Sequence, residues 1–193
     1  TLASYGVGPR TEVIAYDDHR LAFAARLWWL MRSLGYRPPR LLNGGYQAFL
    51  ASGGEADTAV PEAAPCAVTA AAADFSGYCD IEGLRAAQAA GALLVDSREE
   101  RRYQGLEEPI DPVAGHIPGA INRPWQGVTA ASGVALSRDG IEAHWGDALD
   151  ADQLVVYCGS GVTACVNLFS LALLGRDDAT LYAGSWSDWC AYL

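Results

Sequence analysis

The sequence predicts an α/β protein in which a parallel sheet is flanked by helices. Short apolar runs rich in valine, leucine and isoleucine alternate along the chain with longer apolar runs at helical spacing. When a helix joins two neighbouring strands of one sheet, the crossover makes those strands parallel. The chain has 193 residues, of which 51% are hydrophobic and 19% charged, so it also has enough apolar material for a packed core.

The elements of the longer, C-terminal part follow in order from local signals. Asp80 is expected to cap a helix over residues 81–90, which Gly91 ends. Ser137 is expected to cap a second helix over residues 138–149. The apolar run over residues 164–174 predicts a third helix. Strands are expected at residues 92–95, 120–122, 154–157 and 179–182.

Cys158 directly follows the strand expected at residues 154–157 and precedes the helix that begins at Ala164. Between them stands Gly159-Ser160-Gly161-Val162-Thr163. The two glycines let the backbone curl so that several N–H groups point to one place, and the helix adds the positive end of its dipole. Both effects favour a thiolate over a thiol. We therefore predict that Cys158 is a reactive nucleophile.

The first fifty residues repeat part of this pattern. Asp17 ends a short apolar run, and a helix-like run, a glycine stop and a glycine-aromatic signature follow, as they do after the cysteine. We expect one folding unit to be used twice, with residues 1–50 as the C-terminal part of a first copy and residues 74–193 as a full second copy. Residues 51–73, rich in Ala, Pro, Gly and Glu, are expected to form a linker. Since the first copy holds too few elements to close a core, we expect its upstream part to be absent here.

Composition excludes several classes of partner. Thirteen basic and 23 acidic residues give a net charge of −10, so no affinity for nucleic acid is expected. No apolar run reaches the roughly 18 to 20 residues of a membrane span, and the start of the chain lacks a signal-peptide pattern. The five cysteines form no CxxC pair, which favours neither a disulfide framework nor a metal site. We expect a cytoplasmic protein without membrane partners or bound metal.

Four segments carry a resemblance to a known family. They are LLVDSREERRYQG at 93–105, EPIDPVAGHIPGAINRPW at 108–125, LVVYCGSGVTA at 154–164 and YAGSWSDW at 182–189. Together they resemble the two-domain rhodanese-like sulfurtransferases, which use thiosulfate or 3-mercaptopyruvate. The resemblance implies that Cys158 attacks the outer sulfur of a small-molecule donor, holds it as a persulfide and passes it to a thiophilic acceptor such as cyanide or a thiol. It implies no cofactor.

The resemblance also implies roles for further residues. Arg102 matches the family's arginine for the donor anion. The loop is expected to stabilise the persulfide through its N–H groups, with hydroxyl hydrogen bonds from its serine and threonine; its residues are Gly159, Ser160, Gly161, Val162 and Thr163. We expect Arg98 to fix its loop through an ion pair with Asp96. Asp17 occupies the place of the cysteine in the first copy, and a carboxylate cannot carry sulfane sulfur. The first copy is therefore expected to be catalytically silent and to form a wall of the cleft.

Several other residues are interpreted as structural. His116 is expected to be a hydrogen-bonded turn residue and not a general base. Cys165 and Cys190 are expected to pack and not to act as resolving cysteines. Trp28 and Trp29 lie on an apolar helix pattern and are expected in the core or at the contact between the two copies.

The preferred donor is less directly indicated. The loop sequence resembles the 3-mercaptopyruvate branch, but that branch has a second arginine where this chain has Ile110 after Glu108-Pro109. We therefore favour thiosulfate, with 3-mercaptopyruvate as the alternative.

Two other enzyme classes are excluded, and one alternative stays open. A cysteine phosphatase needs an arginine at the end of the loop, where Thr163 and Ala164 stand, and a nucleotide P-loop needs a lysine after its glycines. The open alternative is a sulfur-relay or binding module that passes the persulfide to a protein acceptor without efficient turnover.

Overall fold

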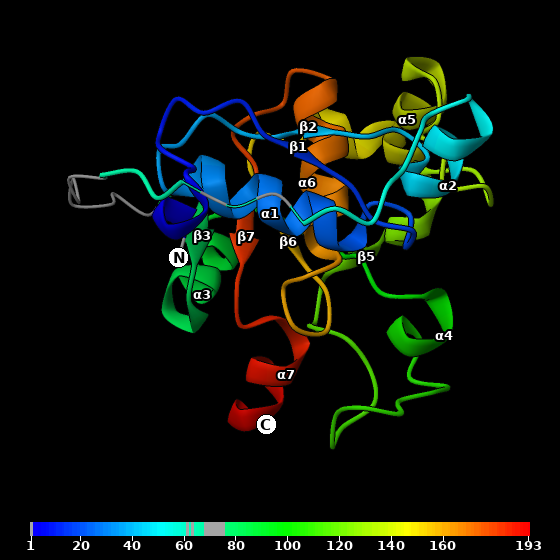
Figure 1. Cartoon of the computed structure of the whole chain (residues 1–193). Coiled ribbons are helices and arrows are strands. Elements are labelled where there is room, and N and C mark those ends of the chain that lie inside the picture. Colours follow the sequence, from blue (N-terminus) through cyan, green and yellow to red (C-terminus); the bar gives the residue numbers. More distant parts are fainter. Residues whose placement is uncertain (1, 61, 63, 68–75) are drawn as a thin grey trace.

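The computed structural model describes residues 2–60, 62, 64–67 and 76–193. The strands are β1 Ile14–Ala15, β2 Arg40–Leu41, β3 Tyr78–Cys79, β4 Leu93–Asp96, β5 Ile121–Asn122, β6 Leu154–Tyr157 and β7 Thr180–Tyr182. The α-helices are α1 Ala22–Ser33, α2 Gly45–Ala51, α3 Ile81–Ala89, α4 Glu100–Tyr103, α5 Arg138–Trp145, α6 Ala164–Leu173 and α7 Ser185–Trp189 (Figure 1). Short 3₁₀ segments lie at Leu2–Tyr5, Trp125–Val128, Gly146–Asp150 and Cys190–Tyr192.

The larger sheet is parallel throughout and has the strand order β3-β7-β6-β4-β5. In its centre Asp96 of β4 pairs with Tyr157 of β6, so these two strands end at the same edge. The predicted fold class, a parallel sheet flanked by helices, is confirmed. The four expected strands are present, and each end lies within one residue of its predicted position. β3 is an additional strand, which was not predicted because it is only two residues long.

Both faces of this sheet are covered by helices, because the side chains of each strand point alternately to the two faces. Leu154 and Val156 of β6 lie in the core formed with α1, α5 and α6. Val155 and Tyr157 lie in a second core formed with α3 and α7. All four side chains are buried, and burying one aliphatic side chain of this size contributes about 2 kcal/mol.

The helix ends follow the predicted caps with one correction. The side chains of Asp80 and Ser137 accept hydrogen bonds from the N–H groups of Gly83 and Gly140 and so cap α3 and α5. The expected helix over 138–149 is wrong in its second half, because α5 ends at Trp145 and a 3₁₀ segment follows. Gly146 has φ of 51° and ψ of −138°, a conformation that breaks the helical ladder.

The first fifty residues form β1, α1, β2 and α2, with β1 and β2 paired in parallel. Helix α1 lies beside α6 (Figure 1). The rings of Trp28 and Phe169 meet edge to face with centroids 5.3 Å apart. Trp28 and Trp29 are buried in the same core as α6, as predicted. Residues 2–50, called the first unit below, thus pack directly onto α6, and residues 76–193 are called the second unit.

The predicted linker at 51–73 falls partly on residues 61, 63 and 68–73, which lie outside the described residues. Of its described residues, Ala51 is the last residue of α2, and residues 52–60, 62 and 64–67 contain neither helix nor strand. Among the described residues, no helix is long and apolar enough to cross a membrane.

Candidate active site

Cys158 follows the last residue of β6 and is 1% exposed, yet it lines a cavity of about 220 Å³. Its N–H donates to the hydroxyl of Ser185 (3.2 Å), and its carbonyl accepts from the N–H of Trp186 (3.0 Å). The first residues of α7, the helix that follows the neighbouring strand β7, therefore hold the backbone of Cys158 in place. The residues lining the cavity are Arg98, Glu99, Arg102, Ile110, Trp125, Cys158, Gly159, Ser160, Val162, Thr163 and Ser187.

The loop after Cys158 needs glycine at one position in particular. Gly161 has φ of +76°, and a Cβ there would lie 2.6 Å from the carbonyl oxygen of Ala183. The carbonyl of Gly159 is held by the N–H and hydroxyl of Ser187 at 2.9 and 2.8 Å. In the described part of the chain, the N–H groups of residues 159–164 donate to no protein acceptor. Donors that are held in place without an acceptor are suited to an anion.

The loop after β1 holds such an anion. The carboxylate of Asp17 accepts four backbone N–H groups, from His19 (2.8 Å), Leu21 (3.0 Å), Phe23 (2.9 Å) and Ala24 (2.7 Å). These donors stand two, four, six and seven residues after the carboxylate. Counted from Cys158, the same offsets give Ser160, Val162, Ala164 and Cys165.

Asp96 and Arg98 form a buried ion pair at the end of β4. Nη2 of Arg98 lies 2.7 Å from the Asp96 carboxylate, and the two side chains are 1% and 0% exposed. Burial opposes the charge of Arg98, but the hydrogen bond to Asp96 raises the pKa of the arginine above its ordinary value. The guanidinium also lies over the ring of Trp186, 4.7 Å from its centroid. The predicted ion pair is confirmed.

Arg102 lies at the rim of the cavity but is not a free cation. Its Nη2 is 2.7 Å from the carboxylate of Glu108 and 3.2 Å from that of Asp111, and its side chain is 13% exposed. The guanidinium lies beside the loop, since a Cβ on Gly159 would be 3.5 Å from its Nη1. The two acids, both nearly buried, share its charge.

Glu108 is the centre of this network. It accepts from both Arg98 (3.1 Å) and Arg102 (2.7 Å) and from the N–H groups of Ile110 and Asp111. Burial alone would raise the pKa of Glu108, but these hydrogen bonds, led by that from Arg102, lower it below its ordinary value. The carboxylate is therefore ionised at neutral pH.

The residues interpreted as structural lie as predicted, with one qualification. Nδ1 of His116 donates to the carbonyl of Tyr103 (2.7 Å), and the two rings stack with centroids 3.9 Å apart. Cys165 is buried, and its burial raises the pKa of the thiol to about 12. Cys190 is only half-buried, and burial is also the main cause that raises the pKa of its thiol.

The expectation that the first unit forms a wall of the cleft is wrong. In the part of the chain that the structure describes, every residue lining the Cys158 cavity lies in the range from Arg98 to Ser187. The first unit instead contacts residues next to that lining. Arg20 donates to the hydroxyl and carbonyl of Thr129 at 2.8 Å each and to the carbonyl of Gln126, next to Trp125. The physical reason is that α1 packs on α6 and not over the open end of the sheet.

Sequence reasoning missed several residues of the site. Ser185, which holds the Cys158 N–H, has φ of +57° and is fully buried. Glu108, Asp111, Trp125 and Ser187 also contribute to the site or its rim. All five lie in the quoted segments, but their loop positions carry no periodic signal that shows where a side chain points.

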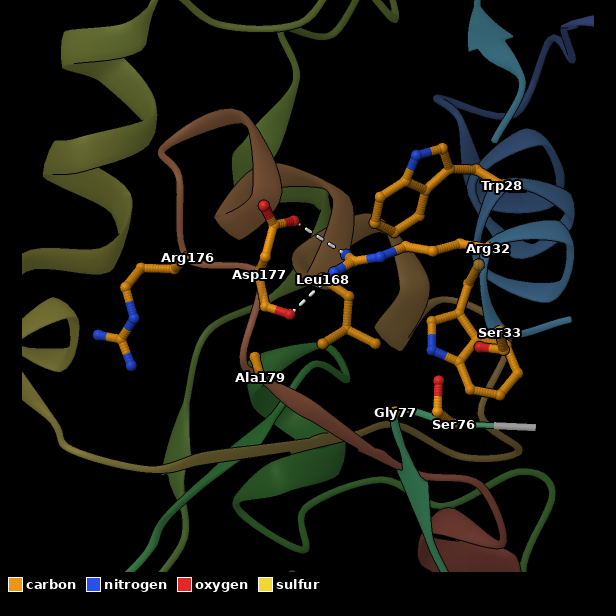
Figure 2. Close-up of a pocket in the computed structure, with 10 residues that line it drawn as sticks. Trp28, Arg32, Ser33, Ser76, Gly77, Leu168, Arg176, Asp177 and Ala179 are labelled. Carbon is orange, nitrogen blue, oxygen red and sulfur yellow. Dashed lines mark hydrogen bonds and ion pairs between the residues drawn. The ribbon is translucent and has the colours of Figure 1, made fainter. Parts of the chain in front are cut away.

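A second cavity, of about 190 Å³, lies between α1 and the loop after α6 (Figure 2). Figure 2 shows the Arg32 guanidinium directed at Asp177, which it meets at 3.1 Å, while Arg176 points away. The same guanidinium lies 5.4 Å from the Trp28 ring centroid. Among the described residues, this cavity has no cysteine in its lining, and its arginine is paired with Asp177, so it does not compete with the Cys158 cavity as a site of sulfur chemistry.

Comparisons with known proteins agree with this geometry. The sequence model of the rhodanese-like domain matches residues 80–192. A probable 3-mercaptopyruvate sulfurtransferase of Pseudomonas aeruginosa is 40% identical, with 97% of this chain and 68% of the relative covered. A putative thiosulfate sulfurtransferase of Mycobacterium tuberculosis is 38% identical, with 98% and 67% covered.

A solved structure is similar over the whole described fold. The 3-mercaptopyruvate sulfurtransferase of Leishmania major has a TM-score of 0.84 and 31% identity, and the match covers 100% of this chain and 54% of that one. The chain thus spans about two thirds of the curated relatives and about half of this solved chain.

Proposed function

Because the chain belongs to the rhodanese-like domain family, we propose that it is a sulfurtransferase that moves a sulfane sulfur from a small-molecule donor to a thiophilic acceptor. One observation carries the proposal. Cys158 stands at the start of a loop whose N–H groups have no acceptor among the described residues, inside a cavity at the carboxyl end of a parallel sheet. An anionic sulfur on Cys158 supplies the missing acceptor.

The reaction has two displacement steps. The Cys158 thiolate attacks the outer sulfur of thiosulfate, a new S–S bond forms, and sulfite leaves with the electron pair of the broken bond. Cyanide or a thiolate then attacks the outer sulfur of the persulfide, and the Cys158 thiolate leaves. Each step exchanges one bond to sulfur for another, so no metal or organic cofactor takes part.

The loop stabilises the persulfide in this scheme. The hydrogen bonds at Asp17 indicate which donors act, because the first three offsets from Cys158 select Ser160, Val162 and Ala164. The fourth offset falls on Cys165, whose N–H already donates to the carbonyl of Val162 at 3.1 Å. Gly159 and Gly161 permit the curl of the backbone. Ser160 and Thr163 both line the cavity, and their hydroxyls add hydrogen-bond donors for the substrate. Asp96 and Arg98 hold the neighbouring loop.

Arg102 binds the anionic part of the donor in this proposal. Its charge is shared with Glu108 and Asp111, and Ile110 stands where a second arginine would serve a keto-acid carboxylate. Of the two arginines that line the pocket, Arg98 is buried in its ion pair with Asp96, so Arg102 is the cation left for the donor, which suits a compact anion such as thiosulfate. 3-Mercaptopyruvate is the alternative donor, and the relatives carry both names.

We propose that residues 1–50 are part of a silent copy of the same unit and that residues 74–193 are the catalytic copy. Both parts run strand, loop, helix, strand, helix: β1, α1, β2 and α2, then β6, α6, β7 and α7. The five cysteines are free, which suits a reducing compartment such as the cytoplasm.

A thiocyanate-forming assay tests the function. Purified protein is given cyanide with thiosulfate or with 3-mercaptopyruvate, beside Cys158→Ser and, as a matched control, Cys165→Ala. The proposal expects turnover by the wild type and Cys165→Ala, none by Cys158→Ser, and a higher kcat/KM for thiosulfate. A far higher kcat/KM for mercaptopyruvate selects the alternative donor. Persulfide formation without turnover selects the relay module with a protein acceptor.

A further inference from the structure

Arg26 connects the first unit to the cysteine loop from outside the cavity. It lies on α1, and its Nη1 donates to the carbonyl oxygen of Gly161 at 3.1 Å. The same nitrogen lies 3.8 Å from Sγ of Cys165, and the guanidinium carbon is 4.8 Å from the centroid of the Trp29 ring. Arg26 does not line the Cys158 cavity, and it lies outside residues 80–192 that match the family's domain.

The peptide that Arg26 holds is otherwise difficult to fix. Gly161 has φ of +76°, which glycine enters readily, and glycine also leaves such a conformation readily. On one side its Cα lies against the backbone of Ala183. On the other side its carbonyl accepts from Arg26 and, at 3.3 Å, from the thiol of Cys165. These contacts select one orientation for the peptide between Gly161 and Val162.

That orientation decides where the next N–H points. In a planar trans peptide the carbonyl and the following N–H point in opposite directions. With the Gly161 carbonyl directed at α1, the Val162 N–H is directed away from α1. Val162 lines the Cys158 cavity. Its counterpart by offset, Leu21, donates its N–H to the Asp17 carboxylate at 3.0 Å.

We infer that Arg26 is a positioning residue that fixes the Val162 N–H toward the sulfur carried by Cys158. The inference rests on the proposed function and extends it to a residue of the first unit. A cation bonded to the Gly161 carbonyl also polarises the peptide, which strengthens the Val162 N–H as a donor. The first unit thus takes part in sulfur transfer without touching the substrate.

The chain offers a matched control for a merely structural role. Arg32 lies on the same helix and also joins it to the second unit, through the carboxylate (3.1 Å) and carbonyl (2.9 Å) of Asp177. Like Arg26, it stacks on a tryptophan of α1 (Figure 2). It has no contact with the loop at Cys158. Removing Arg32 therefore tests loss of an attachment between the units, whereas removing Arg26 also releases the peptide.

The experiment compares Arg26→Met, Arg26→Lys and Arg32→Met with the wild type in the thiosulfate and cyanide assay, with urea unfolding of each. We expect Arg26→Met to lower kcat about tenfold, the effect of losing one charge-assisted hydrogen bond, while KM for thiosulfate stays within twofold. Arg26→Lys, which keeps a charged donor, should recover part of kcat. Arg32→Met should keep kcat within twofold of the wild type.

Two results would overturn the inference. One is a kcat for Arg26→Met equal to that of Arg32→Met, and the other is a change confined to KM. If Arg26→Met fails to fold, Arg26→Gln and Arg26→Lys carry the same comparison. The rate at which iodoacetamide alkylates Cys158 at one fixed pH gives a readout that needs no sulfur donor. A slower rate in Arg26→Met supports the positioning role even if the wild type rejects thiosulfate, a result that would count against the proposed function alone.

Discussion

Arg102 and Glu108 form a 2.7 Å ion pair at the rim of the cavity that holds Cys158. Asp111 adds a second carboxylate 3.2 Å from the same guanidinium nitrogen. The arginine proposed to bind the donor anion is thus partly neutralised before the donor arrives. This pairing leads to the first prediction.

Asp111→Asn should lower KM for thiosulfate about fivefold. The change removes one negative charge beside the anion, which is worth about 1 kcal/mol across roughly 6 Å at an effective dielectric constant of about 50, between those of protein and water. Steady-state kinetics at low ionic strength measures the effect. Glu107→Gln, an exposed acid paired with Arg101 near the same loop, is the control and should leave KM unchanged. An unchanged or higher KM in Asp111→Asn would show that Arg102 does not bind the donor.

Glu108→Gln should destabilise the protein by about 3 kcal/mol at pH 7, because it leaves two nearly buried arginines with a weaker partner. The pKa of Glu108 is lowered in the folded state, so its ionisation stabilises the fold above its ordinary pKa of about 4.3. That stabilisation is lost as the pH falls through the lower, folded pKa. Urea unfolding at pH 7 and at acid pH should therefore show a gap between wild type and variant that narrows toward low pH. A gap that is independent of pH would contradict this account.

Gly161→Ala should cost about 3 kcal/mol and abolish sulfur transfer, because the new Cβ meets both a positive φ and the Ala183 carbonyl. Gly175→Ala separates the two causes. Gly175 also has a positive φ, of +89°, but a Cβ there meets nothing within 4 Å. Thermal and urea unfolding should show a cost of only about 1 kcal/mol for Gly175→Ala, with activity kept. Equal costs would mean that the loop can move away from Ala183.

Cys165→Ala should keep kcat within twofold, because the charged Arg26 still holds the Gly161 carbonyl when the weak thiol donor is lost. Since burial raises the pKa of the Cys165 thiol to about 12, this cysteine stays protonated at neutral pH and does not compete for the donor. Peptide mass mapping after brief iodoacetamide treatment of the folded wild type at pH 8 should find the label on Cys158 and not on Cys165. A label on Cys165, or loss of turnover in Cys165→Ala, would assign it a chemical role.

Much of the fold could be predicted because its signals are local. The buried run that ends at Tyr157, the caps at Asp80 and Ser137 and the glycine loop after Cys158 each act over a few residues. The ion pair of Asp96 and Arg98 was predictable for the same reason, since only two positions separate the partners.

The rest of the site depends on contacts between distant segments. Ser185 meets the Cys158 backbone across 27 positions, and Arg26 meets Gly161 across 135. Glu108 reaches Arg102 through an irregular loop whose path has no period. The first unit was expected to form a wall of the cleft because the loop at Asp17 resembles the loop at Cys158. The sequence pattern does not show that α1 packs on α6.

The most direct test of the account is the intact mass of the protein after thiosulfate treatment, with Cys158→Ser alongside. The account predicts a gain of about 32 Da, one sulfur atom, in the wild type only, and its reversal by cyanide. An unchanged mass of the folded wild type with both thiosulfate and 3-mercaptopyruvate would contradict the account. An equal gain in Cys158→Ser would do the same.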